Sequence, residues 1–134
     1  MATSEYDTAE FVIPITPVPA SRVRVPRFGR PFYVGKYADF RQHMRDIALP
    51  ALITGEPLTC YIVFVCHKPA SPANAYPNGD VDNYIKAAWD QLNKRAFFQD
   101  DKQVWKVTAI KRYTTADEEP HIYLKFTKDH PHDD

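Results

Sequence analysis

The segment Leu58–Cys66, LTCYIVFVC, constrains the fold more than any other part of the chain. Apolar residues occupy nearly every position, so an extended strand here would carry apolar side chains on both faces. Such a strand is typical of the centre of a sheet that is covered on both sides. Cys60 and Cys66 would lie about 20 Å apart on it at about 3.3 Å per residue. Since a disulfide needs Cα atoms within about 7 Å, we expect two buried, reduced thiols.

The rest of the chain predicts elements that surround this strand. Residues 11–15 are β-rich and bounded by prolines, which favours an edge strand. The other expected elements are a half-exposed strand at 22–25, a loop or ribbon at 27–35, helices at 36–49 and 82–93, a loop at 69–79, and strands at 104–113 and 121–127. This order predicts one α+β domain over residues 1–134, with a mixed sheet, two main helices, and flexible tails at 1–9 and 128–134.

Charge is unevenly distributed along the chain. Its 17 basic and 17 acidic residues cancel, which argues against a nucleic-acid partner. Residues 20–45 nevertheless hold seven basic residues and one acid, a local charge of +6 (seven minus one). This block could steer a polyanion onto one face, or it could be a solvated surface with no partner. The residues we expect to contact DNA are Arg22, Arg24, Arg27, Arg30 and Lys36.

No apolar run approaches the roughly 20 residues that span a bilayer. The first ten residues are polar and acidic, unlike a signal peptide. We therefore expect a cytoplasmic protein without a membrane partner.

Asp80 and Asp82 begin the segment that carries the chemistry. In an extended segment, residues two apart point to the same side, so these carboxylates can converge. Adjacent acids repel each other, and a divalent cation is the usual relief. One of them could instead cap the following helix, although capping accounts for only one. The pair alone leaves metal binding and capping open.

The predicted helix carries a polar stripe. Asp82, Lys86 and Asp90 fall within about 80° of one another on the helical wheel, with Asn93 on the same stripe. Lys86 could simply pair with Asp82, and Asp90 could pair with Lys86 or Lys94. A lysine beside a reacting phosphate would stabilise negative charge in the transition state.

Asp100 and Asp101 stand just before the strand at 104–113. A tight return of the chain would bring them beside the helix, and we expect them near its N-terminal end. Three carboxylates and a lysine would then converge. Oxygen ligands of this kind suit Mg²⁺ or Mn²⁺, and the chemistry that needs them is phosphodiester hydrolysis.

These residues together resemble the RusA family of Holliday-junction resolvases. The family pattern runs D-x-D-N, a lysine four residues later, D-x-L, and D-D-x-Q-[VI] before a strand. The matching residues here are Asp80, Asp82, Asn83, Lys86, Asp90, Leu92, Asp100, Asp101, Gln103 and Val104. The resemblance covers residues 78–113 strongly and 22–40 more loosely.

The resemblance implies a small homodimer that cuts four-way DNA junctions with Mg²⁺, for which Mn²⁺ would substitute. Asp80, Asp82 and Asp101 correspond to metal-binding acids, with Asp100 a fourth candidate, and Lys86 corresponds to a catalytic lysine. Asn83 and Asp90 take supporting positions. A homodimer also suits the two-fold symmetry of a junction, through either the strand at 58–66 or the ribbon at 28–34.

Two other functions remain open. The chain could cut other branched DNA, such as flaps or forks, because an acid cluster does not encode substrate shape. It could also be a non-catalytic DNA-binding accessory protein. The retained acids count against the second alternative, because carboxylates that face phosphates weaken binding.

Overall fold

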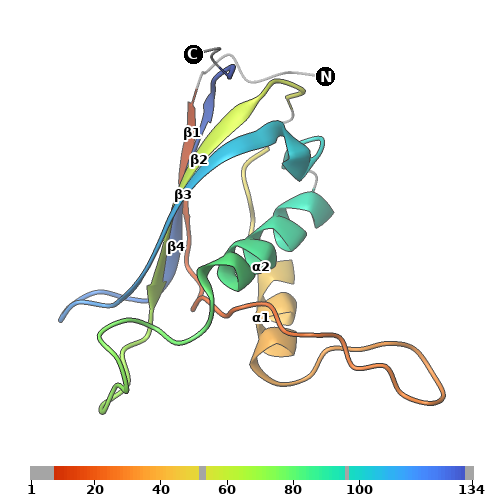
Figure 1. Cartoon of the computed structure of the whole chain (residues 1–134), viewed down its shortest axis with the longest axis vertical. Coiled ribbons are helices and arrows are strands. Elements are labelled where there is room, and N and C mark those ends of the chain that lie inside the picture. The colour runs from red at the N-terminus through yellow and green to blue at the C-terminus, as the bar shows by residue number, and fades with distance from the viewer. Residues whose placement is uncertain (1–7, 52–53, 96, 132–134) are drawn as a thin grey trace.

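The computed structural model describes residues 8–51, 54–95 and 97–131, and these form one four-stranded sheet with two helices on the same side of it (Figure 1). The elements in chain order are β1 (Thr8–Ile13), α1 (Gly35–Arg45), β2 (Leu58–Cys66), α2 (Val81–Lys94), the short 3₁₀ turn η1 (Asp101–Gln103), β3 (Val104–Tyr113) and β4 (His121–Lys128). The expected α+β class, with a mixed sheet and two helices, is confirmed. Of the tails expected at 1–9 and 128–134, Thr8, Ala9 and Lys128 belong to strands, while residues 1–7 and 132–134 lie outside the described residues.

The strands follow the order β1-β4-β2-β3. β2 and β3 are parallel, while β4 pairs antiparallel with both β1 and β2. Parallel neighbours need a long crossover connection, and α2 supplies it between β2 and β3. β1 is an edge strand as expected, and it ends at Ile13, immediately before Pro14.

The core lies between the sheet and the helices. One face of β2 is buried there through Leu58, Cys60, Ile62, Phe64 and Cys66. α2 contributes Ala87, Ala88 and Leu92 to the same core. Both thiols are free and buried, and burial raises the pKa of Cys60 to about 12. The expectation of two reduced, buried thiols is confirmed.

β2 is central in the sheet, as expected. The opposite face of β2 is fully buried only at Val65, near its end, so the prediction that this strand is covered along both sides is wrong for the rest of that face. The pairing register places Val12, Tyr123, Val63 and Ile110 in one row across all four strands. Val12 is 53% exposed and Ile110 is 39% exposed. Both helices occupy the other face, which leaves this row outside the core (Figure 1).

Residues 21–34 form a protruding arm, coloured orange in Figure 1, and not the half-exposed strand expected at 22–25. Arg24 and Phe32 form a single antiparallel bridge within it. Pro26 and Pro31 follow and precede this bridge, and because proline has no N–H, the ladder does not continue. α1 is also shorter than the expected helix at 36–49, since it ends at Arg45.

Candidate active site

The loop before α2 is held in place by neighbours from other elements. Lys111 Nζ on β3 donates hydrogen bonds to the carbonyls of Pro77 and Gly79, at 2.9 and 2.6 Å. The Tyr84 hydroxyl on α2 donates to the Asn78 carbonyl at 2.8 Å. Gly79 has φ +94°, and a Cβ there would lie 3.0 Å from Pro19 Cγ, so a larger residue would be strained and crowded. These contacts fix the backbone that leads into Asp80.

Asp80 and Asp82 lie at the N-terminal end of α2, and both are exposed. Asp80 occupies the N-cap position with extended backbone, and its carbonyl accepts the Asn83 N–H at 3.0 Å. Its side chain makes no capping hydrogen bond. Within the described residues, neither carboxylate has a hydrogen bond or ion pair. The Asp80 side chain therefore does not cap the helix. Both carboxylates are available for a ligand.

The polar stripe of α2 is connected through Asp90. Lys86 Nζ lies 3.5 Å from Asp90 Oδ2, so Lys86 pairs with Asp90 and not with Asp82. The Tyr37 hydroxyl on α1 donates to the same oxygen at 3.3 Å, and burial, followed by the Asp90 charge, raises the pKa of Tyr37 to about 12. Asp90 thus links the two helices. The Lys86 side chain is 61% exposed, which leaves its ammonium accessible to an anion.

Asp100 and Asp101 lie at the other end of α2. Asn93 Nδ2 donates to Asp101 Oδ2 at 2.9 Å. At about 1.5 Å of rise per residue, Asn93 is about 16 Å beyond Asp82 along the helix axis. The expectation that these acids approach the N-terminal end of the helix is wrong. The reason is topological. Asp80 follows the C-terminal end of β2, whereas β3 runs parallel to β2 and therefore begins beside the N-terminal end of β2.

Asp100 is part of a capping box on η1. Its carboxylate accepts the Lys102 N–H at 2.9 Å, and its own N–H donates to Gln103 Oε1 at 2.9 Å. The hydrogen bond from Lys102 is the main cause that lowers the pKa of Asp100. Asp100 therefore has a structural partner, which Asp80 lacks.

The two ends of α2 differ in how well they fit a divalent cation. Mg²⁺ is usually held by one or two carboxylates, with waters and substrate phosphates completing the shell. Asp80 and Asp82 fit this pattern as two exposed, unpaired oxygen donors. A three-acid cluster is not formed, because no group of three or more His, Cys, Asp or Glu side chains able to hold a metal exists in residues 8–51, 54–95 and 97–131.

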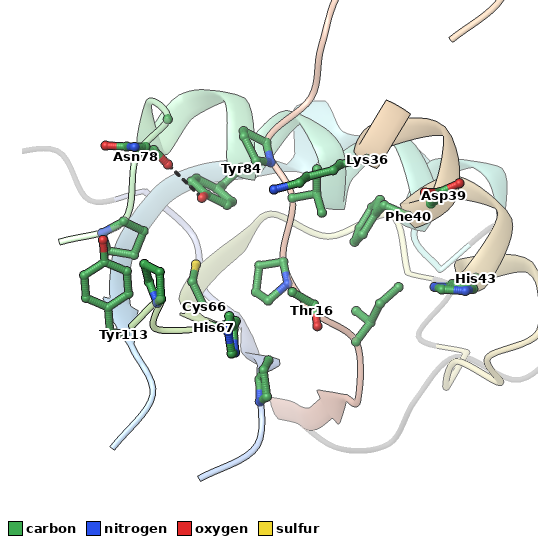
Figure 2. A pocket seen from close by; sticks show the side chains of 18 residues that line it. Thr16, Lys36, Asp39, Phe40, His43, Cys66, His67, Asn78, Tyr84 and Tyr113 are labelled. Carbon is green, nitrogen blue, oxygen red and sulfur yellow. Dashed lines mark hydrogen bonds between the residues drawn. The ribbon is translucent and has the colours of Figure 1, made fainter. Parts of the chain in front are cut away.

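A cleft of about 830 Å³ lies beside the loop that leads into Asp80, although neither Asp80 nor Asp82 lines it (Figure 2). Lys36, Asp39 and His43 of α1 lie toward one end of it, and Asn78 and Tyr113 lie toward the other. Gly79, next to Asp80 in the chain, also lines it. The structure therefore places Lys36, expected as a DNA contact, on the wall of a cleft whose lining extends to Gly79.

Lys111 was not recognised in the sequence. Its register on β3, two residues beyond Ala109 and opposite Phe64, puts it on the face that the helices cover. A lysine on an apolar face is a signal that could have identified it, since such a side chain needs acceptors. Those acceptors are the carbonyls of the loop that leads to Asp80.

The basic arm starts beside the same helix end. The Ala20 N–H donates to the Asn83 carbonyl at 2.9 Å, which ties the residue before the arm to the first turn of α2. The four arginines expected to contact DNA are all exposed on the arm: Arg22, Arg24, Arg27 and Arg30. An exposed acid pair and a basic arm thus originate from one corner of the fold.

A small α+β domain with exposed carboxylates beside a basic arm has the features of a nuclease. A family model described as endodeoxyribonuclease RusA matches residues 14–127. The chain belongs to the RusA endodeoxyribonuclease family. Comparison with curated proteins gave no match. In the described part of the chain, no helix is long and apolar enough to cross a membrane.

Proposed function

We propose that this protein is a divalent-metal-dependent endonuclease that cuts four-way DNA junctions by paired phosphodiester hydrolysis during recombination and repair, in the cytoplasm. The observation that carries the proposal is the pair Asp80 and Asp82, exposed and unpaired at the start of α2 in a chain of the RusA family. Mg²⁺ is the expected metal, with Mn²⁺ as a substitute.

Each residue has a role in this proposal. Asp80 and Asp82 hold the cation, which when bound supplies charge to the phosphoryl oxygens and lowers the pKa of water. Lys86, four residues after Asp82 and 61% exposed, balances negative charge on the reacting phosphate. Asn83 anchors the arm through its carbonyl, and Asp90 positions Lys86. The arm arginines and Lys36 contact flanking phosphates.

We also propose that the protein acts as a homodimer. Asp101 resembles a third metal-binding acid of the family, yet within one chain it lies near Asn93, at the far end of α2. A second copy related by a two-fold axis could bring its Asp101 to the Asp80 and Asp82 of the first. Such a dimer would also present one site to each of the two opposed strands of a junction.

The substrate proposal is tested by incubating the protein with labelled four-way, three-way, flap and linear DNA, with Mg²⁺ and with EDTA. Paired nicks on opposed strands of the four-way junction, and no cleavage in EDTA, are expected. Equal cleavage of linear duplex and junction would refute junction selectivity. Preferential cleavage of flaps or forks would support the alternative of a nuclease for other branched DNA.

The dimer proposal is tested by mixing two inactive variants, Asp80→Asn/Asp82→Asn and Asp101→Asn. If each site takes acids from both copies, a mixed dimer contains one intact site and regains nicking of a single strand. If each site lies within one chain, both sites of the mixed dimer stay broken and no cleavage returns. A monomeric mass by light scattering, with and without junction DNA, would also contradict the dimer.

A further inference from the structure

The tip of the arm carries an aromatic residue, Phe28, that lies outside the core. Phe28 is 84% exposed, more than any other large apolar side chain in the described residues. Gly29 follows it with φ +101°, so the chain turns sharply at this point and Phe28 stands at the apex. Figure 1 shows the arm projecting away from the sheet and both helices. A phenylalanine in this position contributes nothing to the core.

Both ends of the arm are fixed to the body of the protein. The Ala20 N–H bonds to the Asn83 carbonyl of α2 at 2.9 Å. At the other end, the Tyr33 ring packs edge-on against Tyr37 of α1, with centroids 5.0 Å apart, and Arg41 lies 4.4 Å above the Tyr33 ring. The base of the arm is thus held beside α1 and the first turn of α2, the helix end that carries Asp80 and Asp82.

The charge around the apex favours a polyanion. Arg27 and Arg30 flank Phe28, and the Arg27 guanidinium lies 5.7 Å from the centroid of the Phe28 ring. No acidic residue occurs between Glu10 and Asp39. A second protein copy would have to bury these arginines against carboxylates, whereas nucleic acid offers a phosphate on both sides of each base. The alternation of arginine and aromatic ring therefore suits DNA better than a protein surface.

We propose that Phe28 inserts at the branch point of the DNA, where it stacks on an exposed base, and so recognises branched structure. The inference rests on the proposed function and adds a specificity-determining residue to it. A phenyl ring has no group that reads the hydrogen-bonding edges of bases, so its gain comes from contact with a base face. In linear duplex those faces are stacked against each other, while a branch point interrupts the stack. Apolar side chains that enter base steps in this way are known from other DNA-binding proteins.

The arginines and Phe28 therefore have separable roles. Phosphates are present in every DNA, so Arg24 would strengthen binding to linear and branched DNA alike. Phe28 would strengthen binding only where a base face is accessible. The change that Phe28→Ala makes in the affinity difference between a junction and a linear duplex of the same sequence measures the contribution of Phe28.

The test compares wild type, Phe28→Ala, Phe28→Trp and Val25→Ala in EDTA, where cleavage does not interfere. Val25 is 73% exposed on the same arm and serves as a matched aliphatic control. We expect Phe28→Ala to weaken junction binding about tenfold and to leave linear duplex binding unchanged. Phe28→Trp should retain the preference, and its fluorescence should be quenched by junction and not by duplex. Val25→Ala should behave as wild type, while Arg24→Ala should weaken both and lower the salt slope by about 0.9.

Several results would overturn the inference. An equal loss on junction and duplex would make Phe28 a general DNA contact. An unchanged junction preference in Phe28→Ala would remove it from recognition while the proposed function stands. A change of mass in light scattering would assign the apex to contact between copies. If wild type itself does not prefer branched over linear DNA, the proposed function fails as well.

Discussion

The two acid pairs at the ends of α2 have similar sequences and different surroundings. Asp80 and Asp82 are exposed, and within the described residues their carboxylates make no hydrogen bond or ion pair. Asp100 closes a capping box with Gln103, and Asp101 accepts a hydrogen bond from Asn93. The first pair contributes little to local structure, whereas the second helps to shape the turn into β3. Unsatisfied carboxylates at the start of a packed helix are the better candidates for metal binding in an isolated chain.

The largest expected effect separates the pairs by activity. Asp80→Asn and Asp82→Asn should each lower junction cleavage in Mg²⁺ by more than about 100-fold, because a lost ligand removes the charge that activates water. Junction binding in EDTA should be equal or tighter, since one repulsive charge near phosphate is gone. Single-turnover cleavage and gel-shift affinity on the same proteins measure the two effects.

Two further variants complete this experiment. Asp101→Asn should also abolish cleavage if the second copy supplies that acid. Lys86→Ala should lower the rate without the gain in binding, because it removes a positive charge. Wild-type rates in the Asp80 and Asp82 variants would mean that these acids belong to the surface and that the proposed site is wrong.

The next effect concerns the loop that presents Asp80. Lys111→Met removes the hydrogen bonds to the Pro77 and Gly79 carbonyls, and we expect cleavage to fall about 10-fold because the acid pair loses its position. The loss of these bonds should also destabilise the fold by about 1–2 kcal/mol. Lys106→Met, on the same strand and exposed, is the matched control. Equal losses in the two variants would point to a general effect of charge.

A smaller effect tests the structural half of the comparison. Asp100→Ala breaks the capping box on η1 and should lower the melting temperature slightly, whereas Asp100→Asn should not, because asparagine also caps well. Asp80→Ala should leave the melting temperature unchanged, since its side chain makes no capping bond. Thermal denaturation followed by circular dichroism measures all three. A larger loss in Asp80→Ala than in Asp100→Ala would reverse the assignment of structural roles.

The smallest effect is a pH dependence at a third acid that has a structural partner. Glu118, between β3 and β4, accepts hydrogen bonds from Arg112 at 2.6 and 2.7 Å, and these lower its pKa to about 2. A carboxyl whose pKa is lower in the folded state stabilises the fold above its unfolded pKa of 4.5, and this contribution is lost as the pH falls toward 2. The melting temperatures of wild type and Glu118→Gln should therefore differ near pH 7 and converge toward pH 2. A difference that is constant with pH would mean that the charge of Glu118 is not involved.

Much of the fold follows from local patterns. The apolar run Leu58–Cys66 predicted a strand, and the apolar stripe with Asp82 at its start predicted α2 to within one residue at each end. The arm was harder to predict. Arg22 to Val25 alternates as a strand does, but Pro26 and Pro31 beside the single bridge prevent a longer ladder of hydrogen bonds. The exposed part of the sheet was also missed, since a strand with apolar residues on both faces does not reveal which face the helices cover.

The sequence by itself determined most of the elements, the family, and which acids to consider, because periodicity and motif spacing are properties of neighbouring residues. Only the tertiary structure decided where those acids lie relative to one another. Asp82 and Asp101 are separated by 19 positions in the chain. Their distance in space depends on the direction of β3. Because β3 is parallel to β2, the chain must first return along the full length of α2 before it reaches Asp101. The same packing brought Lys111 to the loop at Gly79 and Ala20 to Asn83. These contacts join residues far apart in the chain, and strand order and direction set them, which no local pattern of side chains specifies.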